Sequence, residues 1–202
     1  GDAAGEAPEI PVSVPLRAAG VIAFVFLVAA GPVAGIINVL SISPGERLEL
    51  VEVDLPEIGV TAAVPSGLKK STQKNADGKT MVMFGDPLEP LAVSFTVTEI
   101  PPIGENDLQM LKKTLVGSLR SQVPKGAKLV AEPSEFTAGK HGAVAATARF
   151  DSGAVYERAF LFMEGKMVRV EVVRWPGLSP RAKGSVAVEI ARSVKTRRDG
   201  NE

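Results

Sequence analysis

The sequence predicts an α+β fold in which one transmembrane helix precedes an antiparallel β-sheet domain packed with two main helices. Three observations predict this arrangement. The first is a long uncharged run near the start of the chain, from Ala18 to Ile42. The second is a series of short segments with the period-two alternation of strands, and the third is a pair of helical segments with apolar residues at helical spacing.

The uncharged run predicts a membrane-spanning helix. Its 25 residues carry no charge, with Arg17 and Glu46 as the nearest charged residues. At a rise of about 1.5 Å per residue this is roughly 37 Å of helix, enough to cross a hydrocarbon core of about 30 Å. A signal peptide cleaved near Val28–Ala30 is the alternative. The expected organisation is a flexible acidic and Pro-rich tail over 1–17, the span over 18–42, and a soluble domain over 43–202.

Small residues in this span suggest that another helix packs against it. Gly31 and Gly35 form a G-x-x-x-G pair, and Ala30 with Ala34 repeats the same spacing. Such spacings let two membrane helices approach closely, although Ala- and Gly-rich spans also contain them by chance. Pro32 removes one backbone donor and is expected to kink the helix.

The soluble part begins with two strand-like runs that are broken at Pro56 and closed at Pro65, followed by strands at Thr80–Phe84 and Leu91–Ile100. A helix is expected next, because leucines recur at helical spacing until Val123–Pro124 stops it. Asn106 with Gln109 resembles a capping box at its start.

The clearest element is a β-hairpin of Val155–Met163 and Lys166–Arg174, joined through Glu164–Gly165. A two-residue turn places Arg158 opposite Glu171. One interrupted strand over 128–136 and another over 142–150 precede the hairpin. Ser179 is expected to cap a last helix with a buried stripe of Val186, Ile190 and Val194.

One face of this hairpin is a candidate partner surface, because aromatic residues and arginines dominate interface hot spots. The alternative, which we favour, is that a helix of the same domain covers that face. Trp175, at a strand–loop junction, fits either the core or a contact. The surface comprises Tyr156, Arg158, Phe160, Phe162, Arg169 and Trp175.

Composition argues against several classes of function. The chain has no cysteine and a single histidine, His141. This composition excludes cysteine nucleophiles and metal sites built from several histidines. Formal net charge is zero, which argues against nucleic-acid binding. Five carboxylates could bind a divalent cation, although a solvated strand face explains them better: Glu46, Glu49, Glu52, Asp54 and Glu57. We expect no catalytic residues, no metal and no cofactor.

The order of elements resembles the Mog/PsbP-like family, which includes the photosystem extrinsic protein PsbP and bacterial DcrB-type envelope proteins. The resemblance covers about residues 47 to 196 and not the span. It is carried by Gly142–Ala143, Tyr156, Phe160, Phe162, Gly165–Lys166 and the closing segment from Ser179 to Val194. Family members are mostly non-enzymatic binding or assembly modules on larger complexes.

The resemblance implies a single-pass, non-catalytic accessory subunit that docks on a larger membrane complex, with a photosynthetic complex as the first candidate. Its partners would be the lipid bilayer and other subunits of the complex, through their transmembrane helices and extramembrane face. The soluble domain is expected on the extracytoplasmic side, because a single span after a short tail commonly has that orientation. The alternative is a membrane-anchored receptor whose domain binds a small ligand.

Overall fold

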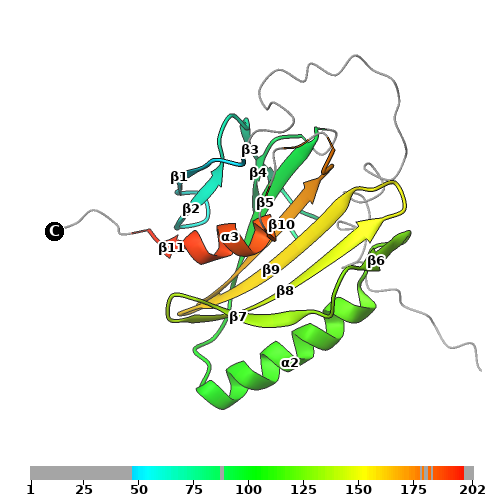
Figure 1. The fold of residues 1–202 in the computed structure, drawn as a ribbon. Helices are drawn as coiled ribbons and strands as arrows, with labels where there is room; N and C mark the ends of the chain where they lie inside the picture. The colour runs from blue at the N-terminus through cyan, green and yellow to red at the C-terminus, as the bar shows by residue number, and fades with distance from the viewer. Residues whose placement is uncertain (1–46, 87–88, 178, 180–181, 183, 198–202) are drawn as a thin grey trace, which may run out of the picture.

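The computed structural model describes residues 47–86, 89–177, 179, 182 and 184–197 (Figure 1). The expected tail and span lie outside these residues, and so do the packing residues Ala30, Gly31, Pro32, Ala34 and Gly35. Among the residues that the structure describes, no helix has the length and apolar character needed to cross a membrane.

A large antiparallel sheet forms the centre of the described domain, in agreement with the predicted α+β class (Figure 1). Its strands run in the order β3-β4-β5-β10-β9-β8-β6, and β7 also pairs with β8. Their bounds are β3 Lys70–Lys74, β4 Thr80–Phe84, β5 Leu91–Glu99, β6 Ala127–Leu129, β7 Ser134–Ala138, β8 His141–Phe150, β9 Val155–Met163 and β10 Lys166–Arg174.

A small second sheet packs on one face of the large one. It joins β1 and β2, the two runs on either side of Pro56, to the short C-terminal strand β11. The bounds are β1 Leu50–Leu55, β2 Val60–Pro65 and β11 Lys195–Thr196. The pairing of β11 with β2 brings the end of the described chain back to its start.

The two helices of the described residues cover opposite faces of the large sheet. Alternate residues of a strand point to opposite faces. Leu161 lies in one core cluster with Ile190 of α3 (Val186–Ser193), whereas Phe160 and Phe162 lie in another with Leu119 of α2 (Glu105–Ser121). The domain is therefore a sheet with a helix on each side.

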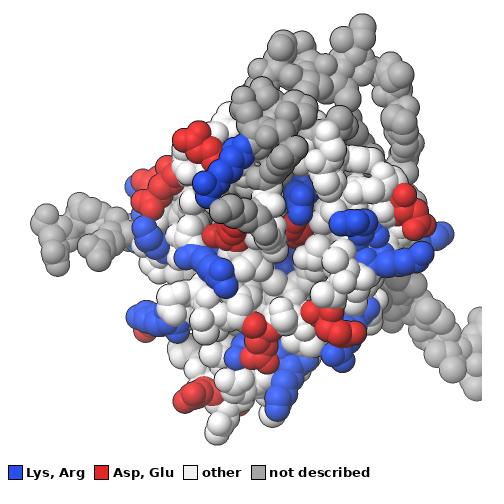
Figure 2. All heavy atoms as spheres, in the orientation of Figure 1, with Lys and Arg blue, Asp and Glu red and all other residues white. Residues whose placement is uncertain are grey.

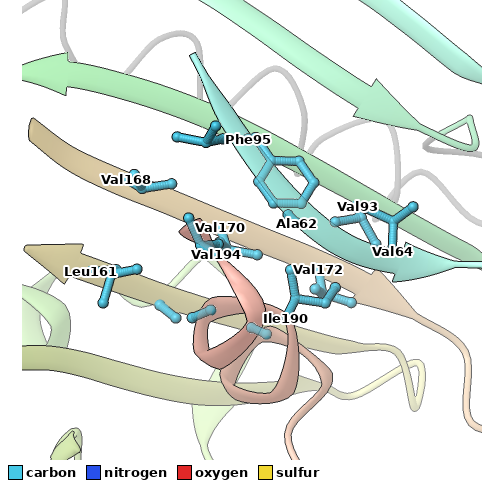
Figure 3. Close-up of a cluster of buried hydrophobic side chains, with 14 of the residues drawn as sticks. Ala62, Val64, Val93, Phe95, Leu161, Val168, Val170, Val172, Ile190 and Val194 are labelled. Atoms are coloured by element: carbon cyan, nitrogen blue, oxygen red, sulfur yellow. The ribbon is translucent and has the colours of Figure 1, made fainter. Parts of the chain in front are cut away.

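The larger core lies between the sheet, α3 and β2 (Figure 3). Phe95 of β5, Leu161 of β9, Val170 of β10 and Ile190 of α3 are each 0% exposed. In the close-up, side chains from these four elements converge with those of Ala62 and Val64 from β2 (Figure 3). The alternating apolar residues of the predicted hairpin supply much of this core.

Two predicted helix caps are wrong. Asn106 and Gln109 lie inside α2, whose N-cap is Gly104 without a side-chain hydrogen bond. Acidic residues in the first turn of α2 are favourable near its positive end. The cap of α3 is Ser185 rather than Ser179: its hydroxyl accepts a hydrogen bond from the Val188 N–H at 3.3 Å.

The segment predicted as one interrupted strand over 128–136 forms two strands, β6 and β7, which pair with different parts of β8. Pro133 lies between them and has no N–H to donate to a ladder. The break at this proline was anticipated, but the resulting pair of separate strands was not.

Candidate functional site

Helix α2 covers the aromatic face of the hairpin. Phe160 and Phe162 are 7% and 4% exposed and cluster with Val144 of β8 and Leu119 of α2. Leu108, Leu111 and Leu115 of the same helix pack against this cluster. The favoured alternative, coverage by a helix of the same domain, therefore holds for these two phenylalanines, and they do not form an exposed patch.

A buried polar cluster lies beside the phenylalanines on the same sheet face. Arg158 of β9 faces Glu171 of β10, as the two-residue turn predicted. The Arg158 Nη2 atom lies 2.9 Å from Glu171 Oε1, and Arg158 Nε donates hydrogen bonds to Glu171 Oε1 at 2.9 Å and to the Tyr156 hydroxyl oxygen at 2.7 Å. The Tyr156 hydroxyl donates to the same carboxylate oxygen. Three polar side chains thus share one contact point inside the domain.

Burial and charge act in opposite directions on the pKa of Glu171. Burial alone would raise it, but the positive charges of Arg158 and Arg169 and the hydrogen bonds from Tyr156 and Arg158 hold it below its ordinary value. The pKa of Tyr156 is raised, chiefly because the buried phenol is costly to ionise and also because it lies beside the Glu171 carboxylate. The cluster is therefore an ionised carboxylate held by a neutral phenol and a guanidinium.

Arg169 completes the cluster with longer contacts. Its Nε lies 3.5 Å from Glu171 Oε2, and its Nη2 donates to the Thr96 hydroxyl at 3.4 Å, near the limit for a hydrogen bond. Among the described residues, Arg158 Nη2 and Arg169 Nε are buried nitrogens with no hydrogen-bond acceptor; Arg158 Nη2 is near Glu171, but the geometry falls short of a hydrogen bond.

A small hollow lies next to Tyr156 and Arg158, where the end of α2 approaches β6 and β8. It offers about 10 Å³ of space, which holds roughly one water molecule. Its walls are mostly apolar, and the lining residues are Leu119, Gln122, Val123, Pro124, Leu129, Ala146, Ala148, Tyr156 and Arg158. A water there could accept a hydrogen bond from Arg158, but the hollow is too small for an organic ligand.

A second buried polar cluster, on the opposite face of the sheet, was not anticipated. Glu157 is 0% exposed, and its Oε1 accepts a hydrogen bond from Arg174 Nε at 2.8 Å. Its Oε2 accepts from the Ser185 hydroxyl at 2.7 Å and from the Ala187 N–H at 3.0 Å. The available signal was a carboxylate at an inward position of an alternating strand, since such a group must be paired when buried.

The remaining residues singled out from the sequence do not converge on one site. Trp175 packs at the edge of a cluster that contains Tyr156 and Val173. His141 opens β8 as a half-buried residue paired with Ala138. Trp175 and His141 therefore have ordinary structural surroundings.

Two of the acidic residues near β1 form ion pairs with lysines. Glu57 lies 2.8 Å from Lys70 and Glu52 lies 2.8 Å from Lys195. Within the described parts of the chain, no group of three or more histidines and carboxylates could hold a metal ion, and Glu46 lies outside those parts. On the face shown in Figure 2, basic and acidic side chains are interspersed.

Comparison with known proteins identifies the fold. No family model and no curated protein matches the sequence. The fold is similar to that of cyanobacterial PsbP (CyanoP) from Synechocystis, with a TM-score of 0.50 and 16% identity, over 82% of this chain and 99% of that one. The described domain therefore has a PsbP-like fold.

Two further solved structures are more distant. A Bacteroides thetaiotaomicron protein matches with a TM-score of 0.44 and 12% identity, over 78% of this chain and 50% of that one. A Pseudomonas aeruginosa protein of unknown function matches with a TM-score of 0.35 and 13% identity, over 63% of this chain and 84% of that one.

Proposed function

We propose that this protein is a non-catalytic, single-pass accessory subunit that docks on and stabilises a larger membrane protein complex. The observation that carries the proposal is the similarity of its fold to cyanobacterial PsbP along nearly the whole of that chain. The family that the sequence resembles includes the photosystem extrinsic protein PsbP, which makes a photosynthetic complex the first candidate. Similarity of fold is an argument by analogy, so the experiment has to identify the partners.

The uncharged run from Ala18 to Ile42 supports the membrane part of the proposal. A span of this composition would anchor the domain in the bilayer, and its Gly31/Gly35 face would pack against a helix of another subunit. The domain would then lie on the water-exposed, extracytoplasmic face of the complex.

A receptor for a small ligand remains the alternative. Such a receptor needs a lined pocket, usually several hundred cubic ångströms in volume. The hollow beside Arg158 holds about one water molecule.

The test is purification of the full chain from its native membranes in mild detergent, with mass spectrometry of the subunits that accompany it. We expect a stoichiometric set of membrane proteins. Recovery of the chain alone and monomeric would overturn the proposal.

Variants of the span test how the chain is held. Gly31→Leu with Gly35→Leu should release it from the complex, because leucine side chains prevent close approach of a second helix. Val21→Leu with Val25→Leu is the matched apolar control and should stay bound. If the glycine double variant also stays bound while the domain unfolds at the wild-type temperature, the span is only an anchor.

A further inference from the structure

Two cations lie along β5, next to the part of the sheet that α2 covers. Lys79, just before β4, donates from Nζ to the Thr98 hydroxyl at 3.0 Å, and Arg169 of β10 donates to the Thr96 hydroxyl at 3.4 Å. Residues two apart on a strand share a face and lie about 7 Å from each other. We call these two cations and two threonines the Lys79–Arg169 strip.

The strip carries an excess of positive charge. Arg158, Arg169 and Lys79 lie on the part of this face that β4, β5, β9 and β10 form, with Glu171 as the carboxylate that Arg158 and Arg169 approach. Glu171 is engaged by Arg158 at 2.9 Å, and Arg169 stands farther off at 3.5 Å. Within the described residues, Lys79 has no carboxylate within ion-pair distance.

Arg169 has unused hydrogen-bonding capacity. Its Nε has no acceptor among the described residues although it is buried, and its side chain as a whole is 23% exposed. A buried N–H without an acceptor is unfavourable. A guanidinium presents a planar fork of donors that matches a carboxylate. A carboxylate arriving from outside would contact the exposed part of the Arg169 side chain and compensate its charge.

We propose that the Lys79–Arg169 strip binds the carboxylates of an acidic segment of a partner subunit. This inference rests on the proposed docking role and adds the chemistry of the partner to it. It also revises the candidate partner surface: its phenylalanines belong to the core under α2, and Arg169 and Trp175 are the members that remain half-buried rather than buried. The charge complementarity favours Asp and Glu side chains on the partner.

The experiment measures binding of a fluorescein-labelled hexaglutamate peptide to the purified full chain in detergent at low salt, by fluorescence anisotropy. Lys79→Gln and Arg169→Gln should each weaken binding by up to about fivefold, the range for one partly exposed ion pair. Lys74→Gln is the matched control, because Lys74 also donates to a threonine hydroxyl, that of Thr80, at 2.8 Å. It should bind the peptide as the wild type does.

Three results would overturn the inference. One is no binding of the peptide to the wild type, and another is an equal loss in Lys74→Gln and Lys79→Gln. The third is that the Lys79→Gln/Arg169→Gln double variant stays associated with the native complex to the same extent as the wild-type chain. If Arg169→Gln fails to fold, Lys79→Gln alone carries the test.

The peptide assay needs no complex, so the two proposals fail separately. If the wild-type chain purifies alone but Lys79→Gln weakens binding of the peptide, the accessory role is overturned and binding of carboxylates by the strip is supported. If the chain purifies with partners but does not bind the peptide, only the proposal for the strip is overturned.

Discussion

Glu157 of β9 and Ser185 at the start of α3 are joined by a hydrogen bond of 2.7 Å, from the Ser185 hydroxyl to the Glu157 carboxylate. The same carboxylate oxygen accepts the Ala187 N–H, one of the donors that a helix leaves unpaired in its first turn. The strand thus fixes where α3 begins and how it sits on the sheet. Ser193, at the other end of α3, accepts from the Ala63 N–H of β2 at 2.8 Å.

Removal of the Glu157 carboxylate should destabilise the domain strongly. Glu157→Ala leaves Arg174, 17% exposed, without its ion-pair partner and removes the acceptor of the Ala187 N–H in the first turn of α3. We expect a loss of about 3–5 kcal/mol in the free energy of unfolding, as for other broken buried pairs. Denaturant titration of the full chain measures it. Glu132→Ala, which removes a 72% exposed carboxylate, should stay within about 0.5 kcal/mol of wild type. A loss below 1 kcal/mol for Glu157→Ala would contradict this account.

Acid should weaken the domain through Glu171. Its pKa is lower in the folded state than its ordinary value of 4.5. The unfolded chain therefore binds the proton more readily, and the free energy of unfolding decreases as the pH is lowered. The stabilisation that ionised Glu171 provides is complete at pH values above its ordinary pKa. It is lost as the pH falls from there through the lower pKa of the folded state. Denaturant titrations at a series of acidic pH values should show a shallower decline for Glu171→Gln than for wild type. Equal slopes would rule out Glu171 as a source of the acid sensitivity.

The packing of α2 depends on the two phenylalanines beneath it. Phe162→Ala should cost about 3–5 kcal/mol, because it removes a large side chain and leaves a cavity between α2 and β9. Met110→Ala changes the outer side of the same helix, where Met110 is 69% exposed, and should cost little. Thermal unfolding of both variants tests this. Similar losses would mean that the helix is held by something other than the aromatic face.

Local patterns predicted the parts of the fold that depend on neighbouring residues. The alternation of Leu91, Val93 and Phe95, and the turn at Glu164–Gly165, needed only sequence within one strand or hairpin, and β5, β9 and β10 follow them. The pairing of β5 with β10 joins residues far apart in the chain, and no local pattern encodes it. The runs that form β1 and β2 were predicted as strands, but the pairing of β11 with β2 joins distant residues and was missed for the same reason.

The candidate site was only partly visible in the sequence. The opposition of Arg158 and Glu171 follows from the register of the hairpin, so it could be predicted. Lys79 and Thr98 come together through the pairing of β4 with β5 and the path of a long side chain. Such contacts require three-dimensional placement, and neither residue stood out in the chain. The cap at Ser185 was missed because Ser179 followed by proline is the stronger local signal.

The turn at Gly85 provides a test of backbone geometry within the sheet. Gly85 has φ of +76°, and a Cβ there would lie 2.6 Å from the backbone oxygen of Leu91, the first residue of β5. Gly78 has a similar φ of +73° with open space around it. Gly78→Ala should therefore cost only the left-handed strain, about 1–2 kcal/mol.

Gly85→Ala should cost more than Gly78→Ala, because the backbone must also move away from Leu91 in a strand paired on both sides. The difference in free energy of unfolding between the two variants isolates that clash, since the strain is common to both. Equal losses would show that the turn can shift without disturbing β5. A larger loss in Gly85→Ala would mean that the entry to β5 is fixed by this close approach, and with it the positions of Thr96 and Thr98 beneath Arg169 and Lys79.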